Sequence, residues 1–130
     1  MSPESPFDID PVAVAAVAGL DEKKAEDIVV LDVGDVFAIA GSFVIASGNN
    51  PRLVRALVEE VERRVHLDTD EKPLRIEGAG EWEWVLLDYG EVVVHVFLDS
   101  VREFYSLERL WGDVPAWRPD FTPAGDGTAE

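Results

Sequence analysis

The chain has 130 residues, 47% of them hydrophobic, which is enough for one domain with a hydrophobic core and too few for two. It contains no cysteine, which excludes disulfides, thiolate metal sites and cysteine nucleophiles. The formal net charge of −16 disfavours direct contact with nucleic-acid phosphates and is compatible with a basic protein partner. The same acidity would also be explained by solubility alone.

The N-terminal residues are polar and acidic and lack the basic region of a signal peptide. The longest apolar run, residues 12–20, is shorter than the roughly 20 residues that a membrane-spanning helix needs. We therefore expect a cytoplasmic protein without a membrane segment.

The first third of the chain predicts one helix followed by two buried strands. Asp10 is placed to cap a helix whose first residue is Pro11. The helix is expected to stop near Gly19, with a restart from Asp21 to Ala25 as the alternative. Residues 27–33 and 42–46 are compact apolar runs rich in β-branched side chains, which is typical of buried strands.

The middle of the chain carries the clearest helix signal. Asn50 and Pro51 are a cap and a first helical residue, and an apolar stripe at helical spacing follows them. That stripe consists of Leu53, Val54, Leu57, Val58, Val61 and Val65. Three further strands are predicted at 74–77, 84–87 and 92–97, the last two as a hairpin.

A last helix is predicted from Ser100 to about Trp111, with Ser100 and Glu103 at the spacing of a capping box. The expected fold is therefore α/β, with a mixed five-stranded sheet flanked by three helices in the order α-β-β-α-β-β-β-α. We expect a flexible N-terminus at 1–9, one domain at 10–112 and a flexible acidic C-terminal tail at 113–130.

The residues that could support catalysis do not form a recognisable set. Asp27 and Asp32 lie five apart on one strand, so they are expected on opposite faces as solvated strand-end carboxylates. Gly41 and Ser42 are similar to the start of a nucleotidyltransferase signature, but no acidic pair follows to hold magnesium. His95 lies between two valines without partners at motif spacing and is interpreted as a structural histidine. No catalytic residue, metal ligand or cofactor is assigned.

The aromatic residues favour a binding role. Apolar side chains of the last helix spread over roughly 220°, although a helix lying on a sheet needs a stripe of only about 100°. They are Val101, Phe104, Tyr105, Leu107, Leu110 and Trp111. Either the C-terminal tail or a second subunit covers the excess, or it is a partner surface. Trp82 and Trp84 lie two apart and are expected on the same side of one strand, as core or as an exposed anchor.

Six segments occur in an order that resembles the ribosomal silencing factor, or Iojap, family. They include the Trp-Val-Leu-Leu-Asp motif at 84–88 and the Phe-Tyr-Ser-Leu-Glu motif at 104–108. The segments are residues 27–33, 43–49, 73–78, 84–90, 93–97 and 102–111. Two positions depart from the family pattern, because an Arg-Gly-Leu-Ser-Ser-like loop is replaced at 34–39 and an expected Asp is Gly41.

The resemblance implies a nucleotidyltransferase-like fold without activity. It also implies docking on the large ribosomal subunit through its basic protein fourteen, which blocks joining of the small subunit and lowers translation under nutrient limitation. The family's partner contacts carry over to Trp84 and Tyr105, with Leu107 and Glu108 from the same helix. The alternatives are a nucleotidyltransferase-like enzyme and a homodimer, formed when the protein is free, whose last helix packs against its own copy.

Overall fold

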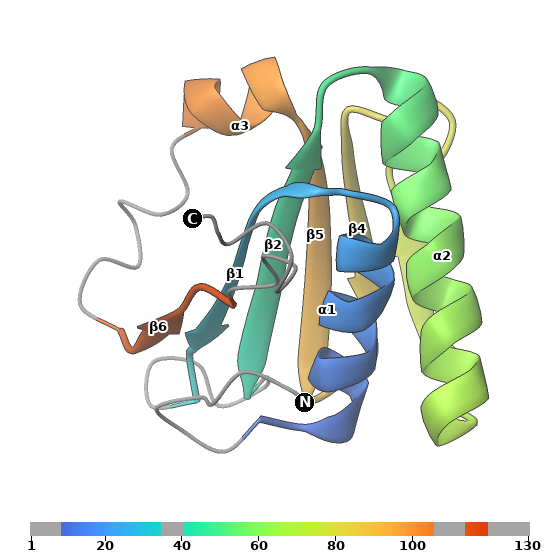
Figure 1. The fold of residues 1–130 in the computed structure, drawn as a ribbon, viewed down its shortest axis with the longest axis vertical. Coiled ribbons are helices and arrows are strands. Elements are labelled where there is room, and N and C mark those ends of the chain that lie inside the picture. The colour runs from blue at the N-terminus through green and yellow to red at the C-terminus, as the bar shows by residue number, and fades with distance from the viewer. Residues whose placement is uncertain (1–8, 35–40, 106–113, 120–130) are drawn as a thin grey trace, which may run out of the picture.

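The computed structural model of the protein describes residues 9–34, 41–105 and 114–119 (Figure 1). The elements in this part of the chain are α1 (Pro11–Glu22), β1 (Glu26–Asp32), β2 (Ser42–Gly48), α2 (Pro51–Thr69), β3 (Arg75–Glu77), β4 (Trp84–Asp88), β5 (Val92–Leu98), α3 (Asp99–Tyr105) and β6 (Ala116–Trp117). None of the helices in these ranges is both long and apolar enough to cross a membrane.

The two long helices begin at the caps that the sequence predicts. A side-chain oxygen of Asp10 accepts from the amide of Val12 at 2.8 Å, and one of Asn50 accepts from that of Leu53, also at 2.8 Å. The predicted stop of the first helix at Gly19 is wrong, because α1 continues to Glu22. Gly19 instead allows close packing of α1 on α2, since a Cβ there would lie 3.1 Å from the Glu60 carbonyl oxygen.

The sheet is mixed, as predicted, but has six strands in the described residues where five were expected. Its order is β3-β4-β5-β2-β1-β6, with β2 and β5 parallel and the other neighbours antiparallel. The sixth strand, β6, pairs with β1 at the edge, where Trp117 lies opposite Val30. Pro115 and Pro119 flank this strand, which is why its sequence does not resemble one that belongs in a sheet.

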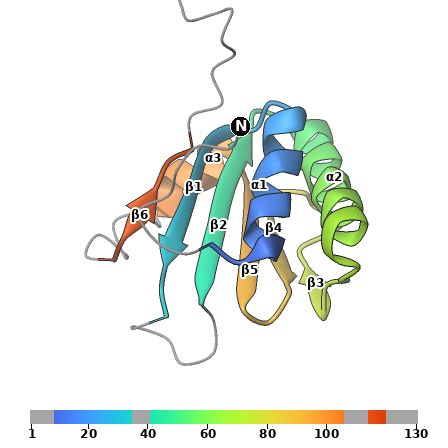
Figure 2. The ribbon, with the colours of Figure 1, turned by 60° about the horizontal axis from the view of Figure 1, so that its bottom comes forward.

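Both faces of the sheet are apolar, and only one of them carries α1 and α2. These two helices lie side by side on that face, as both views show (Figures 1 and 2). Alternate residues of β5 divide between the faces, since Val92, Val94 and Val96 join the core under the helices. Phe97 belongs to a second cluster on the opposite face, with Val93 packed at its edge.

The last helix begins one residue earlier than expected. α3 starts at Asp99, so Ser100 lies inside the helix and the predicted capping box of Ser100 and Glu103 is wrong. The helix follows β5 without a loop, because β5 ends at Leu98. Residues 106–111 of the predicted helix lie outside the described residues.

We predict that β6 contributes to stability, because the half-buried ring of Trp117 packs against the helix-side core. Trp117→Ala should lower the free energy of unfolding by about 1–3 kcal/mol in a urea titration. The matched control is Arg118→Ala at the exposed neighbouring residue, which should change it little. Equal stability of the two variants would show that β6 is dispensable.

Candidate functional site

The face of the sheet opposite α1 and α2 carries a cluster of aromatic rings. We call it the outer face and define it by Phe43, Trp84, Val93, His95 and Phe97, which come from three neighbouring strands. The ring centroids of Trp84 and Phe97 are 4.8 Å apart, and those of Phe43 and His95 are 4.9 Å apart. Such tilted aromatic contacts stabilise a packed cluster beyond the area that they bury.

Trp84 stands at the edge of this cluster and is held by a hydrogen bond. Its Nε1 donates to Nδ1 of His95 at 3.2 Å, and its ring remains partly exposed. Trp84 is the first residue of β4 and lies opposite Phe97, two residues before α3 begins. The strand register therefore places the indole at the same end of the sheet as the last helix.

His95 is a structural residue of the outer face. Only 6% of its surface is exposed, and burial lowers its pKa from 6.5 to about 4. The ring is therefore neutral at pH 7, and because Nδ1 accepts from Trp84, the proton is assigned to Nε2. That atom is buried and has no hydrogen-bond partner among the described residues.

Gly78 lets the end of β3 approach the backbone of Trp84. Its φ is +90°, and a Cβ at this position would collide with the carbonyl oxygen of Trp84. Beside this contact is an open depression of about 310 Å³, lined by Glu77, Gly78, Trp84 and Leu86. The depression is shallow and adjoins the exposed part of the indole, so it can accept a side chain of a partner.

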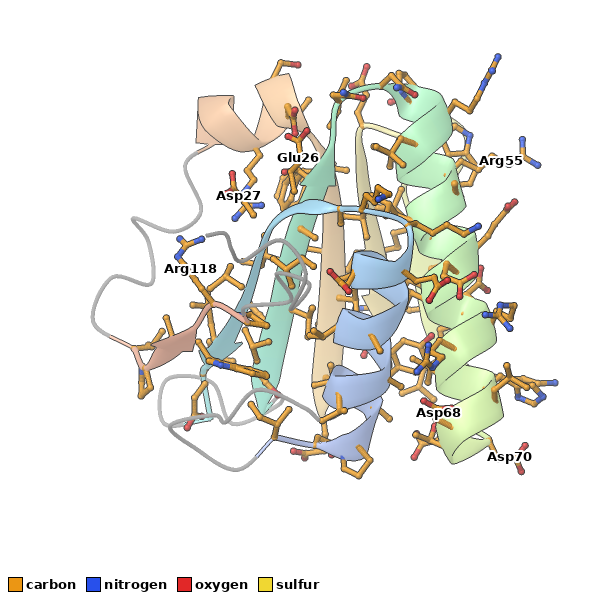
Figure 3. The ribbon with its side chains drawn as sticks, viewed as in Figure 1. Glu26, Asp27, Arg55, Asp68, Asp70 and Arg118 are labelled. Atoms are coloured by element: carbon orange, nitrogen blue, oxygen red, sulfur yellow. The ribbon has the colours of Figure 1, made fainter. Side chains whose placement is uncertain are left out.

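Carboxylates surround this end of the sheet. Glu81 and Glu83 are exposed near Trp84 in the chain, and the exposed Glu77 forms an ion pair with Arg75 at 3.5 Å. Glu26 and Asp27 lie where β1 begins, next to α3 (Figure 3). The aromatic cluster therefore has a negatively charged border, which suits a cationic partner surface.

The structure brings together only part of the predicted site. Trp84 begins β4 at the end of the sheet where α3, which carries the backbone of Tyr105, begins, and the Tyr105 side chain is not among those described. Leu107 and Glu108 lie outside the described residues. The altered 34–39 loop also lies outside them, except for Gly34.

The prediction that Trp82 and Trp84 face the same side is wrong. Trp82 precedes β4 and has a φ of 58°, which interrupts the alternation of an extended strand. Its ring packs against the core under the helices, with the Arg55 guanidinium 5.6 Å from its centroid. Only Trp84 of this pair belongs to the outer face.

Sequence reasoning missed the residues that position Trp84. The alternation of β5 predicts that His95 leaves the valine face, but it does not reveal the hydrogen bond from Trp84. The importance of Gly78 depends on the close approach of two backbones, which has no local signature. A hairpin register counted back from the turn at 88–91 would have paired position 84 with position 97 and pointed to this cluster.

The carboxylates considered for catalysis have structural surroundings. Asp27 has a left-handed backbone with a φ of 50°, and Asp32 accepts from the amide of Gly34 at 3.2 Å in a turn. In the ranges that the structure describes, no three His, Asp or Glu side chains gather as metal ligands.

Comparison with known proteins shows the family. The family model described as "Ribosomal silencing factor during starvation" matches residues 6–129. The chain belongs to the ribosomal silencing factor family. This is a family of ribosome-associated translation regulators that is not known for enzymatic activity.

Individual relatives agree with this membership. The chain is 41% identical over 109 residues to the ribosomal silencing factor of Bacillus subtilis, covering 82% of this chain and 89% of that protein. It is 36% identical over 107 residues to mouse "Mitochondrial assembly of ribosomal large subunit protein 1", covering 81% of this chain and 45% of the mouse protein.

Solved structures show the same fold. A crystal structure of a Chromobacterium violaceum protein matches with a TM-score of 0.76 and 32% identity, covering 91% of this chain and 95% of that one. A Bacillus halodurans protein matches with a TM-score of 0.69 and 36% identity, covering 81% and 94% of the two chains.

We predict that His95 makes the protein less stable in mild acid. Because the folded pKa is lowered, the unfolded chain binds the proton more tightly, and stability falls as the pH decreases from 6.5 towards 4. The loss from this group between pH 7 and pH 5 should be about 2 kcal/mol. His95→Phe should remove that part of the pH dependence, as measured by urea unfolding at both pH values.

The control for this experiment is His66→Gln, at a histidine whose side chain is 50% exposed. This variant shows how the loss of a histidine outside the outer face changes the stability at the two pH values. If His95→Phe and wild type lose equal stability between pH 7 and pH 5, the buried ring does not cause the acid sensitivity.

We also predict that Gly78 is required for the position of Trp84. Gly78→Ala should cost about 2–4 kcal/mol, because the new methyl group meets a backbone carbonyl in addition to the strain of a positive φ. Gly80→Ala is the matched control, since its φ is +119° and nothing lies within 4 Å of its Cβ position. Urea unfolding should show the larger loss for Gly78→Ala, and equal losses would argue that φ alone matters.

Proposed function

We propose that this protein is a translational repressor that binds the large ribosomal subunit through its basic protein fourteen. Bound there, it obstructs joining of the small subunit and lowers translation when nutrients are limiting. The observation that carries the proposal is the outer face with its partly exposed, hydrogen-bonded Trp84. Family membership supports the ribosome as the target, and the resemblance at 84–88 supports the choice of surface.

Trp84 has the properties of a binding anchor. Tryptophan is enriched among the few residues that dominate interface energies. The contacts of this indole with His95 and Phe97 hold the ring before a partner arrives, so little rotamer entropy is lost on binding. The depression beside it, lined in part by Glu77 and Leu86, offers both an apolar wall and a carboxylate.

The charge of the molecule favours a protein contact over an RNA contact. A net charge of −16 repels ribosomal RNA phosphates, whereas the exposed Glu77, Glu81 and Glu83 complement a basic ribosomal protein. Charge complementarity of this kind raises the association rate and orients the two surfaces during encounter.

Repression through this surface does not require a catalysed reaction. A domain of 14.3 kDa bound at the joining side of the large subunit would occupy space that the small subunit needs. The affinity of the docked complex then decides how much translation is lowered. The proposal therefore assigns no catalytic residue and no cofactor.

The last helix contributes the second part of the proposed surface. Tyr105 ends the described part of α3, and Leu107 and Glu108 follow it in the sequence. All three are proposed partner contacts because they match the family motif. A homodimer of the free protein through this helix is a separate proposal, and a concentration-independent monomer mass would refute it.

The test is co-sedimentation with purified large ribosomal subunits at moderate salt. Wild type should pellet with the subunits, and Trp84→Ala/Tyr105→Ala should weaken binding by at least about thirtyfold, since loss of a hot-spot residue costs about 2 kcal/mol or more. Circular dichroism checks that the double variant remains folded.

The matched control is Trp82→Ala, which removes an indole from the opposite face of the sheet. This variant should pellet like wild type. If the double variant also binds like wild type, the proposed surface is wrong. If wild type does not bind large subunits, the proposed function is wrong.

A further inference from the structure

Arg102 is a buried cation in the helix that carries the second part of the proposed surface. Only 7% of the residue is exposed, although arginine side chains are rarely so buried without a specific reason. It lies in the middle of α3, next to Val101, which packs against the outer-face cluster.

The guanidinium joins α3 to two strands. Nη1 of Arg102 donates to the carbonyl oxygen of Asp27 at 2.8 Å and to Oγ of Ser47 at 3.2 Å. Ser47 is 2% exposed, and its hydroxyl donates in turn to the carbonyl oxygen of Glu26 at 3.3 Å. A single side chain thus ties the last helix to β1 and β2, over sequence separations of 75 and 55 residues.

The acceptor is presented by an irregularity in β1. The pairing with β2 shifts between Glu26 and Val29, so β1 contains an extra residue there, and Asp27 has a φ of 50°. Aspartate tolerates this left-handed conformation better than most residues. The carbonyl oxygen in this irregular stretch accepts from Arg102 of α3, and Figure 3 shows Asp27 close to that helix.

Glu26 of β1 also lies near the start of the same helix. The neighbouring carboxyl group of Asp99, the first residue of α3, is the main cause of a raised pKa of Glu26. Two ionised carboxylates repel each other, so this pair does not hold the helix in place at pH 7. The hydrogen bonds of Arg102 tie the described part of α3 to β1 and β2.

We infer that Arg102 is a positioning residue for the docking surface: by binding the β1 bulge and Ser47, it fixes α3 at the end of the sheet where Trp84 lies. This inference rests on the proposed function, because it assigns Arg102 a role in the same surface. Arg102 is buried and does not itself touch the partner. Its effect on binding passes through the orientation of α3, which carries Tyr105.

The experiment compares three variants of the full chain. Arg102→Met keeps the apolar stem and removes every donor, Arg102→Lys keeps a cation with a smaller donor set, and Ser47→Ala removes one acceptor. Amide hydrogen exchange of the free protein reports on the position of α3, and co-sedimentation reports on the affinity for purified large subunits.

In Arg102→Met, the backbone amides of residues 99–105 should exchange hydrogen at least about tenfold faster than in wild type. The same variant should bind large subunits about tenfold more weakly. Arg102→Lys should recover part of both losses, because an ammonium can still reach one of the two oxygens. Ser47→Ala should lie between Arg102→Met and wild type, since the bond to Asp27 remains.

Val61→Ala is the control for a general loss of stability. Val61 lies on the fully buried face of α2 and belongs to the helix-side core, so this variant should unfold at lower urea concentration yet keep wild-type affinity. If Arg102→Met binds as well as Val61→Ala, or if α3 exchanges at the wild-type rate in it, the positioning role is refuted. If wild type itself fails to bind subunits, the proposed function fails, and hydrogen exchange still decides whether Arg102 holds α3.

Discussion

The alternation of side chains along β5 is the constraint on which the rest of the structure depends. β5 lies between β4 and β2, and its odd and even residues separate two apolar clusters. Val94 and Val96 belong to the core that α1 and α2 bury, which supplies most of the hydrophobic stabilisation. His95 and Phe97 belong to the other face, where Val101 of α3 packs against the cluster and Trp84 remains partly exposed. One strand therefore serves both stability and the proposed docking.

Sequence periodicity was sufficient for most of the fold because the principal elements bury one regular face. The α2 stripe and the β4–β5 hairpin have strong local signals, and both lie where they were predicted. The errors have a common cause. Gly19, Trp82 and β6 are decided by contacts with distant segments, namely the close approach of α2, a left-handed turn before β4, and pairing with an edge strand. The local preference of a segment for helix or strand contains no information about these contacts.

The sequence proposed Trp84 as a contact residue through the motif at 84–88, and its role in binding stays a prediction. The strand register explains why Trp84 lies at the same end of the sheet as α3. What the sequence could not reveal is how the indole is held, since a hydrogen bond between residues 84 and 95 and a glycine at 78 have no shared local pattern. The buried His95 also leaves Nε2 without a partner among the described residues, a cost that a purely structural cluster could avoid with an apolar ring. This cost is offset in the structure by Nδ1 of His95, which accepts the hydrogen bond from Trp84.

The β1 bulge extends this reasoning to the opposite end of the chain. The Asp27 carbonyl that accepts from Arg102 lies in the irregular part of β1, where the pairing with β2 shifts between Glu26 and Val29. The left-handed backbone at Asp27 is therefore a local irregularity whose benefit lies in α3, far away in the sequence. Interfaces gain affinity when their elements are oriented before the partner arrives. In this domain both sides of the proposed surface meet that condition, because Trp84 is held by its neighbour in the sheet and α3 is held by a buried guanidinium.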